Sequence, residues 1–192
     1  MQRCWFKTFI SRRKTGLIFL SFGFFFFFVA FSFKAYQKSR QNILSFSQAP
    51  ELLTEVSEEL LPAQILIPNT GVDLAVFPAR VEDDIWQISR EGASYLSGSG
   101  IPGREGNVII YGHNKNSLFG PIRWLEKEAE IKLSNKRGEE FIYKVVETKT
   151  VSPDLIEVLS STEDPVLTLY TCTGFLDSQR YVVKAKLQPE AE

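Results

Sequence analysis

Short runs of alternating apolar and polar residues fill the chain after residue 62. Period-two alternation between stretches rich in Gly, Pro and Asn predicts β-strands. The strand-like runs are Ala63–Ile67, Leu74–Phe77, Asn107–Tyr111, Glu130–Leu133, Glu139–Thr150, Val166–Cys172 and Arg180–Leu187. Helical patterns are few and short, at Ile88–Leu96, Ser117–Leu125 and Asp154–Ser160. Many strands with few helices predict a mainly all-β fold, a closed or nearly closed barrel rather than a doubly wound sheet.

Two short connections predict which strands pair. Asn135–Gly138 separates two strand patterns and is typical of a hairpin turn. The loop 173–179 has only 7 residues, which favours an antiparallel pair between the last two strands. Because the end of one strand then lies beside the start of the next, Cys172 and Arg180 are expected at the same rim of the sheet.

Side-chain alternation within Val166–Cys172 divides this strand into two faces. Leu167 and Leu169 lie on one face, whereas Tyr170 and Cys172 lie on the other together with Thr168. The cysteine is therefore expected on the face opposite the two leucines.

An uncharged apolar run occupies the 18 residues 16–33. A helix of this length covers about 27 Å, enough for the hydrocarbon core of a bilayer. The run is apolar on every side, unlike a helix at the surface of a soluble domain. A cleaved signal peptide is the alternative, but small residues at suitable spacing occur only at 47–49, far beyond the run. The pattern therefore favours a retained transmembrane anchor.

Charge is strongly segregated around this run. Residues 1–50 hold 8 cations and no Asp or Glu. Of these cations, 5 precede the run and 3 follow it, at 34–40. By the positive-inside rule, the N-terminus lies in the cytoplasm and residues 41–192 lie outside the cell membrane. The rest of the chain holds 14 cations against all 23 acids, a net charge of −9. This balance argues against nucleic acid as a partner.

These features divide the chain into four parts. We expect a cytoplasmic N-terminus at 1–15, a transmembrane anchor at 16–33, an extracellular stalk at 34–62 and a folded domain at 63–192. Within the stalk, apolar residues recur at helical spacing between two prolines, at Leu52, Leu53, Val56 and Leu60. This short amphipathic helix over 50–62 either packs on the domain or shields its cleft, and both arrangements fit the sequence.

Composition narrows the chemistry. The 192 residues are 44% hydrophobic and 23% charged, which is typical of one folded domain with an appendage. With 1 histidine and 2 cysteines, the chain has too few ligands for a multi-histidine zinc site or an iron–sulfur site. Glu82-Asp83-Asp84 offers carboxylates for calcium, but a solvated acidic turn is the favoured interpretation. No cofactor is therefore expected.

The two cysteines lie on opposite sides of the predicted membrane. Cys4 precedes the anchor and is interpreted as an incidental or palmitoylated thiol. Cys172 is a lone thiol in an oxidising compartment, where it is either part of an intermolecular disulfide or a reactive group. Its neighbours Thr171, Thr173 and Gly174 argue against simple core packing.

The single histidine, His113, also ends a strand pattern. Gly112 before it permits a sharp turn or a close approach of the backbone. A lone histidine is usually structural or solvated. Together with an unpaired thiol and an arginine at a strand edge, it becomes a candidate for catalysis.

Three motifs in order resemble a known family. Gly112-His113-Asn114 is followed by Thr168-Leu169-Tyr170-Thr171-Cys172 and then by Arg180 at the start of the last strand. The bacterial sortases have a Gly-His pair, a TLxTC motif and an arginine several residues later, and the chain resembles them over residues 63–187. The short form, the single anchor and the stretch Cys172–Phe175 are similar to the class D and E groups. The resemblance implies an eight-stranded β-barrel and a cysteine transpeptidase.

The resemblance also implies roles for three residues. Cys172 would attack the scissile carbonyl of a C-terminal sorting signal of LPxTG type and form a thioester. Arg180 would hold the oxyanion, and His113 would protonate the leaving amine and later deprotonate the incoming one. The acceptor amine would be a peptidoglycan precursor or a lysine of a pilin subunit, with no metal taking part. The loop Val151–Pro165 would form much of the groove for the signal.

A non-enzymatic role is the alternative. A membrane-tethered β-domain could bind a surface partner and use Cys172 for an intermolecular disulfide. In that case Cys172→Ser would abolish a covalent dimer, whereas His113 and Arg180 would be dispensable. Papain-like and L,D-transpeptidase arrangements fit poorly, because here the histidine precedes the cysteine by 59 residues.

Overall fold

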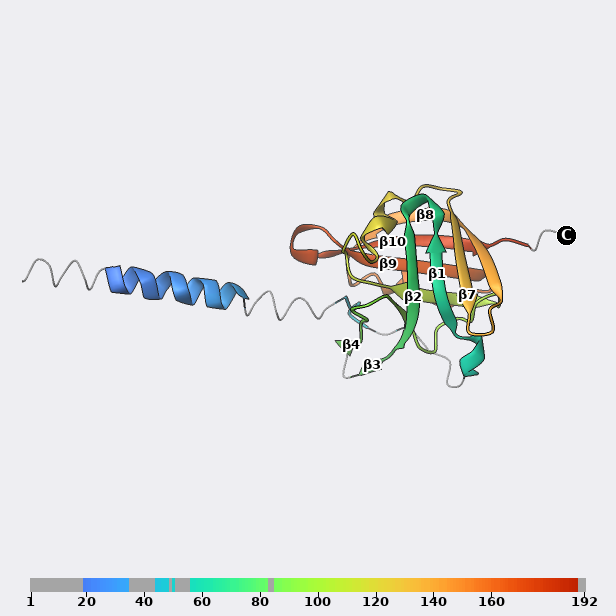
Figure 1. The fold of residues 1–192 in the computed structure, drawn as a ribbon, viewed down its shortest axis with the longest axis horizontal. Coiled ribbons are helices and arrows are strands. Elements are labelled where there is room, and N and C mark those ends of the chain that lie inside the picture. Colours follow the sequence, from blue (N-terminus) through green and yellow to red (C-terminus); the bar gives the residue numbers. More distant parts are fainter. Residues whose placement is uncertain (1–18, 35–43, 49, 51–55, 83–84, 190–192) are drawn as a thin grey trace, which may run out of the picture. The chain divides into compact units, whose positions relative to one another are not determined.

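The computed structural model describes residues 19–34, 44–48, 50, 56–82 and 85–189. The chain forms two compact units, Met1–Gln41 and Asn42–Glu192. In the first unit, residues 19–34 form a helix with exposed side chains (Figure 1). Within the described ranges, no helix is both long and apolar enough to cross a membrane. The first residues of the predicted anchor, 16–18, lie outside those ranges, and the anchor stays a prediction.

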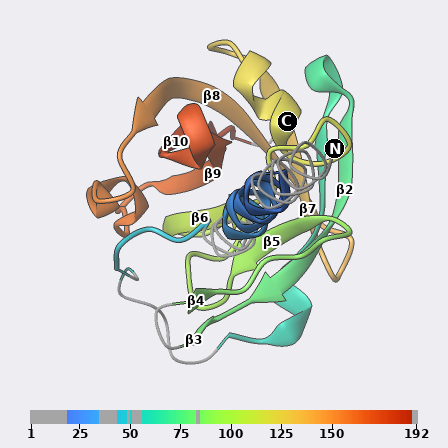
Figure 2. The same cartoon turned by 90° about the vertical axis from the view of Figure 1, so that its left-hand side faces the viewer.

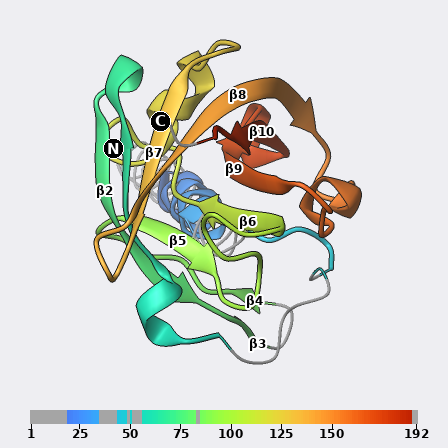
Figure 3. The same cartoon turned by 90° about the vertical axis from the view of Figure 1, so that its right-hand side faces the viewer.

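Eight strands of the second unit close into a barrel in the order β1-β2-β5-β6-β9-β10-β8-β7 (Figure 1). Figures 2 and 3 show them surrounding a common interior. The barrel strands are β1 (Pro62–Ile67), β2 (Val72–Ala79), β5 (Ala93–Leu96), β6 (Gly106–Tyr111), β7 (Glu130–Asn135), β8 (Glu140–Val151), β9 (Pro165–Thr173) and β10 (Gln179–Leu187). The predicted eight-stranded, mainly all-β barrel is confirmed.

Two of the eight strand pairs run parallel, β2 with β5 and β6 with β9, and the others are antiparallel. A separate ribbon pairs β3 (Val81–Glu82) with β4 (Ile85–Trp86). The parallel β6–β9 pair matters most for function, because it sets the ends of two distant segments side by side.

Alternation along the strands fills the barrel interior. In β9, Leu167 and Leu169 belong to the interior core, whereas Tyr170 and Cys172 belong to a second cluster on the outside. The side chains of β6 alternate in the same way, with Val108 in the interior core and Ile109 in the cluster on the outside. Burying one large apolar side chain stabilises a fold by about 1.5–3 kcal/mol, so the interior drives closure. The predicted division of β9 into two faces is confirmed.

In the segment before β6, the structure differs from the sequence prediction. The helical pattern at Ile88–Leu96 is wrong, because Ala93–Leu96 is the barrel strand β5. All four residues of β5 are buried, so no alternation marks it as a strand. Gly92 lies so close to β2 that a Cβ there would sit 2.3 Å from the carbonyl oxygen of Ala75. Packing on both faces, rather than local propensity, makes this segment a strand.

The other local predictions fare better. Asn135–Gly138 forms the turn between the antiparallel strands β7 and β8, with Gly138 at a φ of +83°. The other two helical pieces are the 3-10 helices η3 (Gly120–Trp124) and η4 (Ile156–Leu159). Further 3-10 helices are η1 (Glu58–Leu60), η2 (Pro68–Thr70) and η5 (Phe175–Asp177). Of the helix expected over 50–62, residues 51–55 lie outside the described ranges, and η1 is the described helical part.

Candidate active site

Cys172 lies near the end of β9, on its outer face. Its thiol is free, and 6% of the residue is exposed. It belongs to what we call the outer cluster, the buried side chains Leu44, Phe46, Ala79, Trp86, Leu96, Ile109, Tyr111, Val151, Val158, Leu159, Tyr170, Cys172 and Val182. The rings of Tyr111 and Tyr170 stack with centroids 5.1 Å apart. The thiol is therefore set in a largely apolar, aromatic layer outside the barrel.

Arg180 is the direct cross-strand partner of Cys172, as the short loop predicts. It is 2% exposed. Its Nη1 donates to the carbonyl oxygens of Asp177 at 2.9 Å and Gln179 at 3.0 Å. Its Nη2 donates to the carbonyl oxygen of Ser45 at 2.9 Å. These backbone acceptors fix the guanidinium at the rim where the thiol lies.

The parallel β6–β9 pair brings His113 toward Cys172. The amide of Gly112 donates to the carbonyl of Tyr170 at 3.3 Å, which continues the pairing beyond the end of β6. The Thr171 hydroxyl donates to the carbonyl of Gly112 at 2.7 Å and is buried. Because Gly112 is held against β9 in this way, the residue after it leaves β6 alongside the end of β9. The three predicted site residues thus come from neighbouring strand ends.

Gly112 fits this position because it has no side chain. A Cβ there would lie 2.9 Å from Cβ and 3.0 Å from Cγ of Phe119, a fully buried residue of the interior core. The carbonyl of His113 accepts hydrogen bonds from the amides of Lys115 at 2.8 Å and Phe119 at 3.1 Å, which closes a tight turn. The glycine lets the chain pass over the core while His113 stays partly exposed.

Burial sets the protonation of the resting site. Burial raises the pKa of Cys172 to about 11, although the positive charge of Arg180 acts in the opposite direction. Burial also lowers the pKa of His113, and nearby positive charges lower it further. The charge of Asp177 raises both pKa values. At neutral pH the site therefore holds a neutral thiol and a neutral imidazole.

The turn between β9 and β10 carries backbone strain. Leu176 and Asp177 have φ values of +52° and +59°, in the left-handed region that side chains other than glycine seldom adopt. The turn leaves Phe175 exposed and places the carbonyl of Asp177 on Arg180. Sequence patterns alone did not single out Asp177, whose role depends on this turn.

A short segment of the predicted stalk reaches the site, which the sequence did not predict. We call residues 44–47 the strap; Figure 3 shows it in cyan, outside the barrel. The Ser45 carbonyl accepts from Arg180, and the buried Phe46 ring lies 5.1 Å from Tyr170 and 6.2 Å from Trp86, between centroids. The amide of the last strap residue, Ser47, donates to the carbonyl of residue 153 at 3.0 Å. The only sequence signal is a short alternation of apolar and polar residues.

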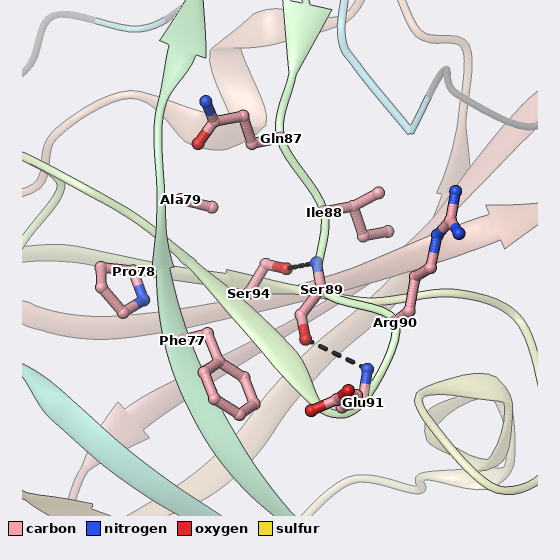
Figure 4. Close-up of a pocket in the computed structure, with 9 residues that line it drawn as sticks. All are labelled: Phe77, Pro78, Ala79, Gln87, Ile88, Ser89, Arg90, Glu91 and Ser94. Atoms are coloured by element: carbon pink, nitrogen blue, oxygen red, sulfur yellow. Dashed lines mark hydrogen bonds between the residues drawn. The ribbon is translucent and has the colours of Figure 1, made fainter.

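A cavity of about 320 Å³ opens between the end of β2 and the segment before β5 (Figure 4). Its lining is Phe77, Pro78, Ala79, Gln87, Ile88, Ser89, Arg90, Glu91 and Ser94. The Ser89 amide donates to the Ser94 hydroxyl at 2.8 Å, and the Ser89 hydroxyl accepts from the Glu91 amide at 3.2 Å (Figure 4). Arg90, which lines this cavity, carries a charge that lowers the pKa of His113.

The structure also bears on whether the described residues could bind a metal ion. The part of the chain that the structure describes contains no group of three His, Cys, Asp or Glu side chains placed to hold a metal ion. Of the acidic run Glu82-Asp83-Asp84, the two aspartates lie outside the described ranges. The interpretation of that run as a solvated turn stays a prediction.

The fold and the site together define a class: a closed β-barrel with a cysteine and an arginine paired on its outer face and a histidine on the adjacent strand end. The family model described as a sortase domain matches residues 65–188, most of the barrel unit. The chain belongs to the sortase family.

Several known sortases are similar to this chain. Sortase A of Listeria monocytogenes is 27% identical over 135 residues, which are 68% of this chain and 58% of that protein. Sortase A of Streptococcus agalactiae is 25% identical over 161 residues, 79% of this chain and 63% of that protein. The chain thus spans less than two thirds of the length of either relative. The solved Clostridium perfringens Sortase D5 transpeptidase matches with a TM-score of 0.59 and 28% identity, over 70% of this chain and 83% of that one.

Proposed function

We propose that this protein is a cysteine transpeptidase that cleaves a C-terminal sorting signal of LPxTG type and transfers the acyl group to an amine. The observation that carries the proposal is the strand register, with Arg180 opposite Cys172 and the end of β6 alongside β9. Membership of the sortase family supports it, and the Clostridium perfringens relative is itself called a transpeptidase.

The first step forms a thioester on Cys172. The thiol passes its proton to His113, and the sulfur attacks the scissile carbonyl carbon. Arg180 donates hydrogen bonds to the oxyanion of the tetrahedral intermediate, a group of fixed positive charge aimed at charge that develops only in the transition state. The C–N bond then breaks, and the leaving nitrogen takes the proton from His113.

The second step releases the acyl group. An acceptor amine attacks the thioester carbonyl and gives its proton to His113, the C–S bond breaks, and the proton returns to the thiol. Water competes with the amine and yields hydrolysis instead. The acceptor is a peptidoglycan precursor or a lysine of a pilin subunit.

The loop between β8 and β9 is a candidate wall of the peptide groove. It contains η4, whose Val158 and Leu159 are buried in the outer cluster with Cys172. Ile156 of the same helix is only partly buried and packs against that cluster, so it is the η4 residue that an apolar side chain of a bound signal would meet.

Transpeptidation with defined substrates tests the proposal. The full-length chain in detergent is incubated with a panel of LPxTG-type peptides and with either a peptidoglycan stem peptide or a pilin peptide containing lysine. We expect a peptide-amine product by mass spectrometry with one of the two acceptors, and none with Cys172→Ala. Failure of every peptide with both acceptors would contradict the proposal.

We also propose that the protein is anchored in the cell membrane by residues 16–33, with a cytoplasmic N-terminus and residues 41–192 outside. The segregated charge of the chain supports this orientation. Protease added to intact cells should then remove the domain. A domain that is degraded only after lysis would overturn the orientation.

The alternative is a binding protein that uses Cys172 in an intermolecular disulfide. The burial of Cys172 disfavours it, because a disulfide partner would need the sulfur at the surface. Denaturing gel electrophoresis without reductant separates the two: the binding protein would show a dimer that Cys172→Ser abolishes, and the transpeptidase would show no Cys172-linked dimer.

A further inference from the structure

We propose that Asn107 is a positioning residue of the peptide groove. Together with Thr168 it ties the end of η4 to β6 and β9, and so fixes the candidate groove wall relative to Cys172. The inference deepens the proposed function and rests on it, because it assigns a residue to the binding of the sorting signal. Asn107 lies outside the three sequence motifs, and the alternation in β9 assigns Thr168 only to a face of its strand.

Asn107 occupies a closely packed place in β6. It is 2% exposed and pairs with Val166 of β9 in the parallel register. The amide of Gly100 donates to the carbonyl of Asn107 at 2.8 Å, and a Cβ on that glycine would lie 2.7 Å from the backbone nitrogen of Asn107. Because Val108 faces the interior, the side chain of Asn107 leaves the strand on the outer face. The side-chain amide is therefore held at a fixed place beside β9.

The side-chain hydrogen bonds of Asn107 join three elements. Its Oδ1 accepts from the Thr168 hydroxyl at 2.7 Å, and both residues are buried. Its Nδ2 donates to the carbonyl of Ser160 at 3.0 Å and, more weakly, to that of Val158 at 3.5 Å. The hydroxyl fixes the orientation of the amide, because a flipped amide would point its oxygen at those two carbonyls. A buried amide without such partners would cost free energy.

The two carbonyls lie at the end of η4. The last carbonyls of a helix have no partner within the helix, so they accept from another group or from water. Here the donor is a barrel residue, so the end of η4 is bonded to β6 and, through Thr168, to β9. The buried side chains of Val158 and Leu159 hold the same turn by packing. Ile156, which is partly buried against the outer cluster, is thereby kept at a fixed position beside it.

The two threonines of the TLxTC motif hold different parts of the site. Thr171 donates to the carbonyl of Gly112 and so holds the segment that carries His113. Thr168 acts through the amide it is bonded to on the loop between β8 and β9. Both threonines lie on the strand that carries Cys172, so one strand positions the imidazole and the groove wall relative to the thiol. Loss of the Thr168 bond should therefore weaken peptide binding and leave the chemical step intact.

A matched pair of variants at Thr168 tests the inference on the full chain. Thr168→Val removes the hydroxyl at nearly constant shape, whereas Thr168→Ser keeps it. Asn107→Ala removes the amide as a second, independent change. Thr148→Val is the control, the same change at a partly exposed position of β8. The readouts are kcat and KM for the sorting peptide, hydrogen exchange of residues 156–161 by mass spectrometry, and the melting temperature.

We expect Thr168→Val and Asn107→Ala to raise the KM for the sorting peptide about tenfold with kcat within about twofold, because fewer molecules hold the groove wall in the binding position. Hydrogen exchange at 156–161 should accelerate about tenfold in the same two variants. Thr168→Ser and Thr148→Val should match the wild type in both readouts. The double variant of Asn107→Ala and Thr168→Val should be little worse than either single one, since the two residues form one network.

The KM, kcat and the serine variant each offer a result that would overturn the inference. An unchanged KM in folded Thr168→Val and Asn107→Ala would do so, and so would a fall in kcat at constant KM. An effect of Thr168→Ser equal to that of Thr168→Val would do so as well, since the hydroxyl would then have no part in binding. Melting temperatures show which variants are folded, and if Asn107→Ala unfolds, the two Thr168 variants decide alone.

The two proposals fail in different ways. If neither the wild type nor any variant processes a peptide while exchange at 156–161 accelerates as expected, the network around Asn107 stands and the transpeptidase proposal falls. If the wild type processes peptides and Thr168→Val has the KM and the exchange rate of the wild type, the transpeptidase stands and the inference on Asn107 falls.

Discussion

The two faces of the same barrel strands bury different kinds of side chain. The interior holds mainly aliphatic side chains, such as Leu167 and Leu169 of β9 and Val183 of β10, together with some aromatic rings. The outer cluster, on the opposite face of the same strands, holds stacked rings and the thiol of Cys172, beside the buried guanidinium of Arg180. A single alternation along each strand produces both faces.

This difference separates stability from chemistry. Interior side chains mostly fill space, and the polar groups among them, the Tyr95 and Tyr143 hydroxyls, are hydrogen-bonded. The outer face buries a thiol, a guanidinium and a tyrosine hydroxyl, groups that cost free energy unless they find partners. It is also closed by a segment from outside the barrel, the strap, whereas the interior is closed by the strands themselves. Part of the burial of the outer face therefore comes from a segment that is not a barrel strand.

The largest expected contrast lies within β9. Cys172→Ala should abolish turnover of the sorting peptide with little change in the free energy of unfolding. Leu169→Ala, three residues earlier on the interior face, should lower the free energy of unfolding by about 2–5 kcal/mol, because it leaves a cavity in the core. Urea denaturation and peptide turnover measured on both variants check the contrast. Residual turnover by folded Cys172→Ala would break it.

The next effect concerns Arg180. Arg180→Gln removes the positive charge and most of the N–H donors that would hold the oxyanion, so kcat/KM should fall about 10²–10³-fold. Arg137→Gln is the matched control, because Arg137 pairs with Glu59 at the surface at 2.9 Å, and it should leave kcat/KM unchanged. Equal values for the two variants would remove Arg180 from the mechanism.

Gly112 links the two faces, since its backbone holds His113 while its Cα lies against the core. Gly112→Ala drives a methyl group into Phe119 and should lower the free energy of unfolding by about 1–3 kcal/mol, with a fall in turnover. Phe119→Leu in the same chain should recover part of both losses, because the clash is with that ring. Additive losses in the double variant would contradict this account of the glycine.

The smallest expected effect is a change in the pKa of His113. The chain has 1 histidine, so its proton NMR titration reports His113 alone. Arg90→Gln should raise the pKa of His113, because the Arg90 charge lowers it, and Asp177→Asn should lower it further. A shift in the opposite direction for either variant would contradict the placement of these charges.

The same two groups shape the pH profile of kcat/KM. Thiol and imidazole together hold one proton in the reactive form, so the profile should be a broad bell between the lowered pKa of His113 and the raised pKa of Cys172, about 11. As pH falls below the pKa of His113, the pair takes a second proton and activity drops. Arg90→Gln should therefore move the acid limb to higher pH.

Local patterns predict much of this fold. Alternation marks the long strands, and the loop 173–179 correctly pairs Cys172 with Arg180. The Gly-His pair, the TLxTC motif and the arginine after them predict His113, Cys172 and Arg180 as site residues, because their order along the chain is itself the signal. None of these predictions needs knowledge of contacts between distant segments.

What the patterns miss depends on such contacts. Strand β5 is buried on both faces and looks like part of a helix until β2 and β6 are beside it. The strap is held against the site by contacts far along the chain, such as that with Arg180, 135 residues away. Asp177 matters because a strained turn points its carbonyl at the same arginine. Each of these features arises when the barrel closes.

A trapped acyl-enzyme tests the central claim most directly. The full chain is mixed with a sorting peptide without an acceptor amine, quenched in acid, digested and mapped by mass spectrometry, with a hydroxylamine-treated aliquot alongside. The account predicts the acyl fragment on Cys172, absent after hydroxylamine and absent in Cys172→Ala. An adduct on another residue, or none in the wild type with any peptide of the panel, would contradict it.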